Sequence, residues 1–179
     1  MNLKTDERKL FALEVGKTAL IIIDMQNDFV RQGGMLYVAD ALKTVPAIDR
    51  LIRFFRRSKM PVLYTKAVIP QAPLLKRKYY EVLHPEWIEG KALVKGHHRY
   101  YADIAKTSDC TDIIDEIYPE QDDIIIEKVF YNAFEGTLLE YILRALKIEY
   151  LVLVGVATHV CVESTARAAF DKQFMVALV

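Results

Sequence analysis

Five short apolar runs alternate with segments of helical periodicity along this chain. The runs are rich in β-branched residues and cover Ala19 to Ile23, Pro61 to Thr65, Asp123 to Glu127, Tyr150 to Val154 and Phe174 to Val179. Continuous apolar runs of this length are typical of strands that are buried on both faces of a parallel sheet. We therefore predict five strands at these positions.

Between these runs, apolar residues recur every three or four positions, which is the spacing of one face of a helix. This pattern predicts helices over Pro46 to Arg57, Asp112 to Ile117, Thr137 to Leu146 and Val160 to Lys172. Strands that alternate with helices favour βαβ units with right-handed crossovers. The predicted fold class is therefore α/β, with an open parallel sheet that carries helices on both faces.

One segment, Ala67 to Asp109, does not fit this alternation. It is too long for an ordinary connection between a strand and a helix, and it holds the only tryptophan, Trp87. One interpretation is a surface excursion or an oligomer contact, and the other is a lid or flap over a substrate site. Long structured loops in compact domains are often functional, which keeps the second interpretation open. With this excursion, residues 1–179 are expected to form a single domain.

The composition excludes several classes of protein. The 179 residues are 53% hydrophobic, which is too apolar for a disordered chain. Lys plus Arg and Asp plus Glu both number 24, so the chain lacks the basic excess of a nucleic-acid-binding protein. No apolar run approaches the roughly 20 residues of a membrane span, and the N-terminus lacks the apolar core of a signal peptide. The two cysteines are too few for a disulfide scaffold and indicate a reducing compartment. We expect a cytoplasmic protein that acts on a small molecule.

Three side chains with useful chemistry stand near the ends of predicted strands. In open parallel sheets, ligands bind outside the carboxyl ends of the strands. Asp24 follows the first strand, Lys128 follows the third, and Cys161 lies after the fourth, where a helix is expected to open. A helix N-terminus and a neighbouring ammonium lower the pKa of a thiol. A carboxylate can take the thiol proton and later hand it to a leaving amine, so the three residues predict a nucleophilic site.

Each of these residues also has an ordinary structural interpretation. Cys161 alone would be a small buried hydrophobic residue, Asp24 a turn or helix cap, and Lys128 a solvated charge at a strand end. A redox-active thiol is another interpretation, although it requires a nearby resolving cysteine and Cys110 lies far away in the sequence. The residue types by themselves leave these alternatives open.

The segments around the three residues resemble the motifs of a known enzyme family. Asp24-Met25-Gln26-Asn27-Asp28-Phe29 is similar to the opening motif of the isochorismatase-like cysteine hydrolases. Lys128 with Ala133 to Leu138 is similar to their second motif, and Gly155 to Ala166 to their third. The resemblance runs from about Lys17 to Val179 and is weak across the excursion. It implies a three-layer α/β/α sandwich that forms a homodimer or homotetramer.

The resemblance also implies roles for individual residues. Cys161 corresponds to the nucleophile of the family, Asp24 to its general base and acid, and Lys128 to the third member of the catalytic triad. The backbone N–H groups of Ala157 and Cys161 correspond to an oxyanion hole. In the family, the peptide bond that enters this hole is cis, and here it would join Val156 to Ala157.

Five residues are expected to bind the substrate or to support its site. Phe29 corresponds to a position that lines the pocket, and Gln26 to one that supports the triad. Thr158 and His159 stand in the loop before Cys161, within reach of a bound substrate. Basic residues exceed acidic ones between Lys66 and Tyr101, which suggests either a clamp for a substrate carboxylate or a solvated face. Arg99 is the first candidate for the clamp.

Departures from the family pattern narrow the expected chemistry. Nicotinamidases of the family carry Asp-x-His after the second strand as metal ligands, whereas Tyr64 to Pro70 holds neither a carboxylate nor an imidazole. True isochorismatases lack the cysteine nucleophile that is present here. Relatives also usually continue past the fifth strand, while this chain stops in it at Val179.

The resemblance therefore implies an amidohydrolase that needs no metal and no cofactor. It would cleave a small amide, carbamoyl or ureido compound and release ammonia through a covalent acyl-enzyme, as N-carbamoylsarcosine amidases do. The alternatives are a nicotinamidase-type amidase and a non-catalytic relative that acts as a binding or scaffold protein. Neither a nucleic acid nor a membrane is an expected partner.

Overall fold

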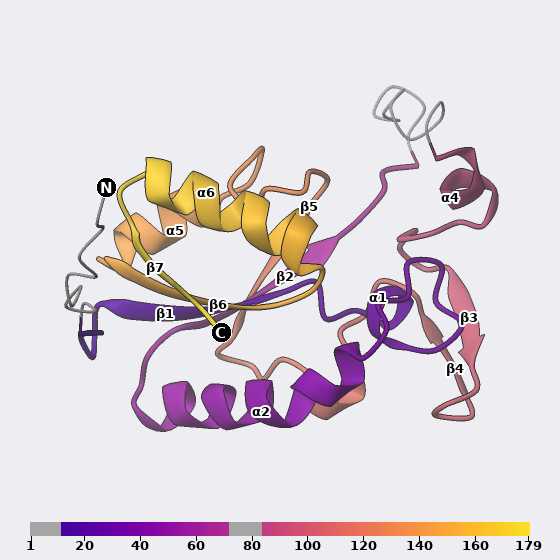
Figure 1. Ribbon diagram of the computed structural model, residues 1–179, viewed down its shortest axis with the longest axis horizontal. Helices are drawn as coiled ribbons and strands as arrows, with labels where there is room; N and C mark the ends of the chain where they lie inside the picture. Colours follow the sequence, from indigo (N-terminus) through magenta and orange to yellow (C-terminus); the bar gives the residue numbers. More distant parts are fainter. Residues whose placement is uncertain (1–11, 72–83) are drawn as a thin grey trace, which may run out of the picture.

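The computed structural model describes residues 12–71 and 84–179, and a five-stranded parallel sheet forms its centre. The strand order is β5-β2-β1-β6-β7, and each neighbouring pair is parallel (Figure 1). The strands are β1 (Thr18–Ile23), β2 (Val62–Ala67), β5 (Ile124–Lys128), β6 (Tyr150–Gly155) and β7 (Met175–Leu178). They coincide with the five predicted strands to within two or three residues at each end.

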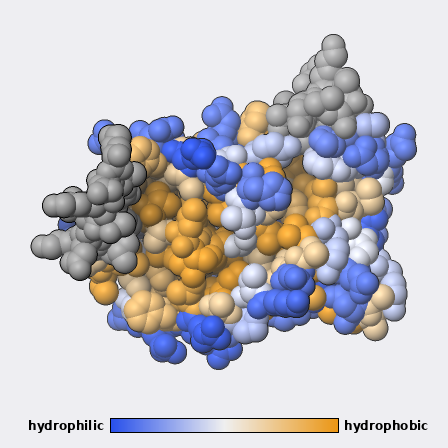
Figure 2. All heavy atoms as spheres, viewed as in Figure 1, coloured by the Kyte–Doolittle hydropathy of each residue, from blue (hydrophilic) through white to orange (hydrophobic). Residues whose placement is uncertain are grey.

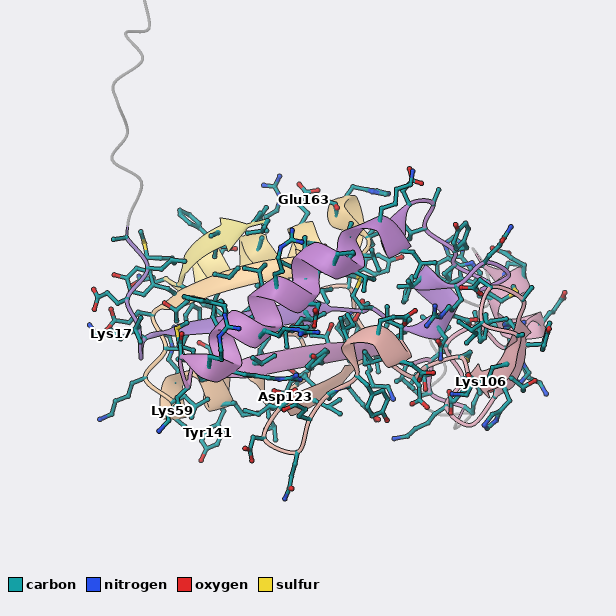
Figure 3. All side chains as sticks on the ribbon, turned by 90° about the horizontal axis from the view of Figure 1, so that it is seen from below. Lys17, Lys59, Lys106, Asp123, Tyr141 and Glu163 are labelled. Atoms are coloured by element: carbon teal, nitrogen blue, oxygen red, sulfur yellow. The ribbon has the colours of Figure 1, made fainter. Side chains whose placement is uncertain are left out.

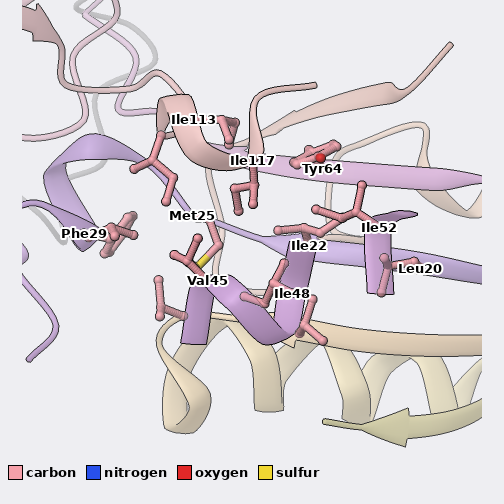
Figure 4. Close-up of a cluster of buried hydrophobic side chains, with 14 of the residues drawn as sticks. Leu20, Ile22, Met25, Phe29, Val45, Ile48, Ile52, Tyr64, Ile113 and Ile117 are labelled. Atoms are coloured by element: carbon pink, nitrogen blue, oxygen red, sulfur yellow. The ribbon is translucent and has the colours of Figure 1, made fainter. Parts of the chain in front are cut away.

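Helices cover both faces of this sheet, which confirms the predicted fold class. Helix α2 (Ala41–Arg57) lies on one face, and α5 (Leu139–Ala145) and α6 (Glu163–Asp171) lie on the other (Figure 1). Strand β1 is fully buried because it separates two cores. Leu20 and Ile22 point into the core beneath α2, which is drawn in Figure 4. Ala19, Ile21 and Ile23 point into the opposite core, as the alternation of strand side chains requires.

The structure corrects the predicted start of the first long helix. Helix α2 begins at Ala41, so Pro46 lies inside it and not at its first turn. A proline inside a helix removes one backbone hydrogen bond. The buried residues of α2 nevertheless continue at helical spacing on both sides of Pro46, from Ala41 and Val45 to Ile48 and beyond. Packing of this apolar stripe on the sheet outweighs the local preference of proline.

Two other predicted helices are shorter than expected. The helix predicted over Asp112 to Ile117 is only a 3₁₀ turn, η2 (Asp115–Ile117). The Ile114 N–H instead donates to the Met25 carbonyl (3.0 Å), which draws this segment out into an extended conformation. The helix predicted over Thr137 to Leu146 begins at Leu139, where the Thr137 hydroxyl accepts the Leu139 N–H (3.1 Å).

The helix predicted over Val160 to Lys172 is divided in two. A short π-helical turn, η3 (Thr158–Val162), precedes α6, which begins at Glu163. Cys161 therefore lies inside η3 and does not open a regular helix. Two N–H groups of this turn, those of Val160 and Val162, donate to the same carbonyl of Ala157 (3.1 and 3.3 Å).

The excursion between β2 and β5 extends beyond the carboxyl ends of the strands (Figure 1). It contains α4 (Pro85–Glu89) and a two-stranded antiparallel hairpin, β3 (His98–Tyr101) and β4 (Lys106–Asp109). Lys106 of this hairpin lies at the opposite end of the molecule from Lys17 and Lys59, which precede β1 and β2 (Figure 3). Within the described ranges, no helix is long and apolar enough to cross a membrane.

The strand order places a topological switch point between β1 and β6. The chain leaves β1 toward β2 and β5 on one side, and β6 and β7 lie on the other side. In open α/β sheets, ligands bind in the crevice at this point. Asp24 and the turn that contains Cys161 both follow the two strands that border it.

Gly155 allows β6 to approach β1 closely at this crevice. Its φ is +118°, and a Cβ atom there would lie 2.1 Å from the Ile23 carbonyl oxygen. The Val156 N–H donates to this same oxygen (2.9 Å), so the turn after β6 is fastened to the end of β1. Only glycine both adopts this positive φ readily and leaves room for the Ile23 carbonyl oxygen.

We expect Gly155→Ala to lower the free energy of unfolding by more than about 4 kcal/mol, because backbone atoms of β1 cannot move away. Gly16→Ala is the matched control, since Gly16 also has a positive φ (+86°) but no atom within 4 Å of its Cβ position. The control should cost only about 1–2 kcal/mol. Urea unfolding measures both values, and equal losses would show that the contact with Ile23 is unimportant.

Candidate active site

The structure brings Asp24, Lys128 and Cys161 together. Asp24 directly follows β1, Lys128 is the last residue of β5, and Cys161 lies in η3 after β6. The Lys128 Nζ lies 2.6 Å from Asp24 Oδ2 and 3.4 Å from Cys161 Sγ. The three residues are 0%, 2% and 5% exposed, respectively. Lys128 therefore points into the protein toward the thiol, and not into solvent.

Thr65 of β2 holds the Asp24 carboxylate in place. The Thr65 hydroxyl donates to Asp24 Oδ1 (2.6 Å) and accepts the Asp24 backbone N–H (3.2 Å). Asp24 itself adopts a positive φ of 51°, which turns the chain sharply at the end of β1. The other oxygen, Oδ2, forms an ion pair with Lys128, but the geometry of this contact is not that of a hydrogen bond. No other described residue donates a hydrogen bond to Oδ2. One carboxylate oxygen is thus fixed, and the other remains able to accept a proton.

Lys128 is a buried ammonium with three neighbours. Besides Asp24 and Cys161, its Nζ contacts the Phe130 carbonyl, to which it donates (3.2 Å). Burial alone would lower the pKa of Lys128, but the attraction of the Asp24 carboxylate and of the Cys161 sulfur raises it above its ordinary value. The side chain therefore keeps its positive charge beside the thiol.

The lowered thiol pKa expected from the sequence is wrong. Burial raises the pKa of Cys161 to about 12, and the neighbouring Asp24 carboxylate acts in the same direction. The Lys128 ammonium opposes both effects but does not overcome them. At neutral pH the sulfur therefore carries its proton, and a strong nucleophile forms only when that proton is removed.

A pocket of about 340 Å³ opens above Cys161 and Lys128. Ala157 also lines it, and the peptide bond between Val156 and Ala157 is cis. Apolar side chains make up most of its walls, among them Phe29, Leu36, Val38, Trp87, Leu93 and Phe130. Trp87 stacks on His84, another lining residue, with ring centroids 3.9 Å apart.

Of the residues expected to bind substrate, Phe29 and His159 line this pocket. Thr158 does not, because it is exposed on the neighbouring side of η3. Gln26 is also absent from the lining, since both ends of its amide are bonded to backbone. Its Oε1 accepts the Ala67 N–H (2.7 Å), and its Nε2 donates to the carbonyls of Ala67 (2.9 Å) and Thr111 (3.0 Å).

Arg99 does not stand where a carboxylate clamp would be required. Its Nε donates to Asp28 Oδ1 (3.0 Å), and its Nη2 donates to the Gly90 carbonyl (3.0 Å). The guanidinium is therefore occupied by protein acceptors and is not among the residues that line the pocket. An excess of basic residues in the sequence could not reveal these partners.

Sequence reasoning also missed several residues of the site. Thr65 stands near the end of β2, so the rule that strand ends form the site could have found it. Trp87, His84 and Leu93 come from the excursion, and only the presence of the single tryptophan hinted at them. Their place in the pocket shows that the excursion supplies a wall of this site.

A larger hollow lies elsewhere in the described structure. It measures about 800 Å³, lies between α6 and β7, and contains none of the three clustered residues. Figure 2 shows hydrophobic residues gathered near β7, where Leu178 and Val179 are exposed. We assign the chemistry to the smaller pocket because the thiol of Cys161 and the ammonium of Lys128 line it, and the Asp24 carboxylate lies directly behind that ammonium (2.6 Å). Within residues 12–71 and 84–179, no three His, Cys, Asp or Glu side chains gather as metal ligands.

Comparisons with known proteins found a matching family model and several similar proteins. A family model described as the isochorismatase domain matches residues 18–179. The chain is 34% identical over 175 residues to the ureidoacrylate amidohydrolase of Klebsiella pneumoniae, across 88% of this chain and 69% of that protein. Its structure is similar to a cysteine hydrolase from Pseudomonas syringae, with a TM-score of 0.83 and 25% identity over 95% of this chain and 73% of the other. It is also similar to N-carbamoylsarcosine amidase from Thermoplasma acidophilum, with a TM-score of 0.68 and 32% identity over 91% and 81% of the two chains.

The raised thiol pKa has a measurable consequence. Alkylation of Cys161 by iodoacetamide should keep accelerating with pH through pH 10, because a pKa of about 12 leaves the thiol protonated at lower pH. Asp24→Asn removes the anion beside the sulfur and leaves the Lys128 ammonium. The apparent pKa should then fall by about 1–3 units. Mass spectrometry of the Cys161 peptide follows the rate.

Cys110 serves as the internal control in the same samples. It is fully buried, its pKa is also raised to about 12 by burial, and its Sγ donates to the Val94 carbonyl (3.3 Å). Its labelling should not respond to Asp24→Asn. If the variant labelled Cys161 no faster than the wild-type protein does, the carboxylate would not be what raises the thiol pKa.

Proposed function

We propose that this chain, which belongs to the isochorismatase family and is an amidohydrolase, releases ammonia from a small carbamoyl or ureido compound. Amidohydrolases are hydrolases of non-peptide C–N bonds. The observation that carries this proposal is the buried cluster of Asp24, Lys128 and Cys161, of which Lys128 and Cys161 line a small pocket. The names of two relatives support it, since ureidoacrylate and N-carbamoylsarcosine both carry a terminal carbamoyl group.

In the first half-reaction, Cys161 attacks the carbonyl carbon of the substrate. Asp24 Oδ2 accepts the thiol proton as the bond between sulfur and carbon forms. The carbonyl oxygen becomes an oxyanion, which the backbone N–H groups of Ala157 and Cys161 stabilise. A single donor of this kind contributes about 3 kcal/mol to the transition state. Lys128 offsets the negative charge that develops beside it.

The C–N bond then breaks, and the acyl group stays on Cys161, as a thiocarbamate from a ureido compound or as a thioester from a simple amide. Asp24 returns its proton to the leaving nitrogen, so that neutral ammonia departs. In the second half-reaction, Asp24 accepts a proton from water, and the resulting hydroxide attacks the acyl carbon. The carbamic or carboxylic acid leaves, and Cys161 recovers its proton from Asp24. The sum is one ureido compound or amide and one water converted to one carbamic or carboxylic acid and one ammonia.

The walls of the pocket restrict the size and polarity of the substrate. A volume of about 340 Å³ admits a small molecule and excludes a folded peptide segment. Phe29, Trp87 and Phe130 offer flat apolar surfaces to the part of the substrate beyond the carbamoyl group. His84 and His159 are polar residues of the pocket lining. These features favour compact ureido acids and amides.

The central test is a hydrolysis panel that is read by ammonia release. We expect turnover of at least one ureido or carbamoyl acid by the wild-type protein. Cys161→Ala should reduce kcat by more than about a thousandfold, because the covalent route is lost. Cys161→Ser keeps the size of the side chain but supplies a poorer nucleophile, and it should be almost as inactive. Circular dichroism confirms that both variants are folded.

Substantial turnover by folded Cys161→Ala would refute the covalent mechanism. A wild-type preference for nicotinamide, with activity lost on chelation and restored by zinc or iron, would favour a nicotinamidase-type amidase. A folded wild-type protein that hydrolyses nothing on the panel would favour a non-catalytic binding or scaffold role. Each outcome is distinct, so the same assay separates the three functions.

A further inference from the structure

The Asp28 carboxylate is fully buried and takes no part in the proposed reaction. It lies in α1 (Asn27–Val30), next to the pocket residue Phe29. Its Oδ1 accepts hydrogen bonds from Arg99 Nε and from the Tyr101 hydroxyl, both at 3.0 Å. Its Oδ2 accepts the backbone N–H of Leu93 (3.2 Å). A single carboxylate thus joins α1 to three points of the excursion.

These bonds lead directly to the pocket wall. Leu93 is itself a lining residue. Arg99 continues the connection, because its Nη2 donates to the carbonyl of Gly90, the residue that ends α4 (3.0 Å). Helix α4 carries Trp87, the largest side chain of the wall. The pair of Arg99 and Asp28 therefore fixes α4 and Leu93 relative to the end of β1.

Asp28 and its neighbour Phe29 also hold two further lining residues through their backbone carbonyls. The Asp28 carbonyl accepts the N–H of Leu36 (3.1 Å), and the Phe29 carbonyl accepts the N–H of Val38 (2.8 Å). Leu36 and Val38 line the pocket. A Cβ at Gly34 would lie 2.2 Å from the Asp28 carbonyl oxygen, so the loop passes very close to α1. Lining residues from the excursion and from the loop after α1 are thus both bonded to one short helix.

We propose that the Arg99–Asp28 pair positions the wall formed by Trp87 and Leu93 and thereby selects substrates by the size of the group attached to the carbamoyl carbon. Arg99 is a positioning residue in this proposal, since it touches the wall and not the substrate. The selection of substrates rests on the proposed function, but the position of the wall does not. It can therefore be measured without turnover.

The geometry explains why arginine is needed at this position. The guanidinium is a planar fork that reaches the Asp28 carboxylate and the Gly90 carbonyl at the same time. A lysine ammonium is a point charge on a flexible stem, and it satisfies one of these acceptors but not both. Arg99→Lys therefore keeps the charge beside Asp28 and releases α4.

Trp87 is the only tryptophan of the chain, so its fluorescence reports on the wall alone. We expect Arg99→Ala and Arg99→Lys to shift its emission to longer wavelength and to increase quenching by acrylamide. The rate of Cys161 alkylation by N-phenylmaleimide should rise about tenfold relative to that by the small reagent iodoacetamide. For the best ureido acid of the panel, KM should rise about tenfold while kcat falls less than about threefold.

Arg53→Ala is the matched control, because Arg53 is an exposed arginine of α2 that pairs with Asp49 (3.0 Å) far from the pocket. It should leave every readout unchanged. Tyr101→Phe removes a single donor from Asp28, and it provides a milder variant if Arg99→Ala does not fold. If the folded Arg99 variants and Tyr101→Phe kept the wild-type emission and alkylation ratio, the proposal would be wrong. A panel without a substrate would refute the proposed function instead, while emission and alkylation would still decide on the wall.

Discussion

A buried ion pair between Asp24 and Lys128 is the interaction on which the site depends. Desolvating a single charge at this depth costs several kcal/mol, so each side chain is tolerated because the other is present. Asp24 directly follows β1 and Lys128 ends β5, and β2 runs between these two strands. Thr65 of β2 donates to the same carboxylate (2.6 Å). The pair therefore ties together the carboxyl ends of three neighbouring strands at the point where the thiol of Cys161 lies.

The Asp24 carboxylate of this pair also affects the protonation of the Cys161 thiol. Burial and the Asp24 carboxylate raise the pKa of Cys161, so the resting sulfur is protonated and chemically quiet. In the mechanism that we propose, proton transfer and bond formation take place together when a substrate fills the pocket, and no free thiolate is needed. The close passage of Gly155 past Ile23 keeps the sulfur within reach of the carboxylate.

The carboxylates of Asp24 and Asp28 come from one short segment but have different partners. Asp24 faces the thiol, and Asp28 faces the excursion that forms the pocket wall. The chemistry is held by the rigid ends of the sheet, whereas the wall is held by side-chain and backbone bonds to a single helical turn.

The sequence by itself predicted the five strands and the fold class, because these depend on the local period of apolar residues and require no distant contacts. The strand-end rule drew attention to Asp24, Lys128 and Cys161, but it left their ordinary interpretations open, and only the resemblance to the family motifs selected them as one site. Three-dimensional packing decided the rest. Pro46 lies inside a helix because the stripe on both sides of it packs on the sheet. Arg99 pairs with Asp28, 71 residues away, because the excursion folds back onto α1. The pKa of Cys161 is raised because burial removes water from the thiol, and only the tertiary structure shows what covers a side chain.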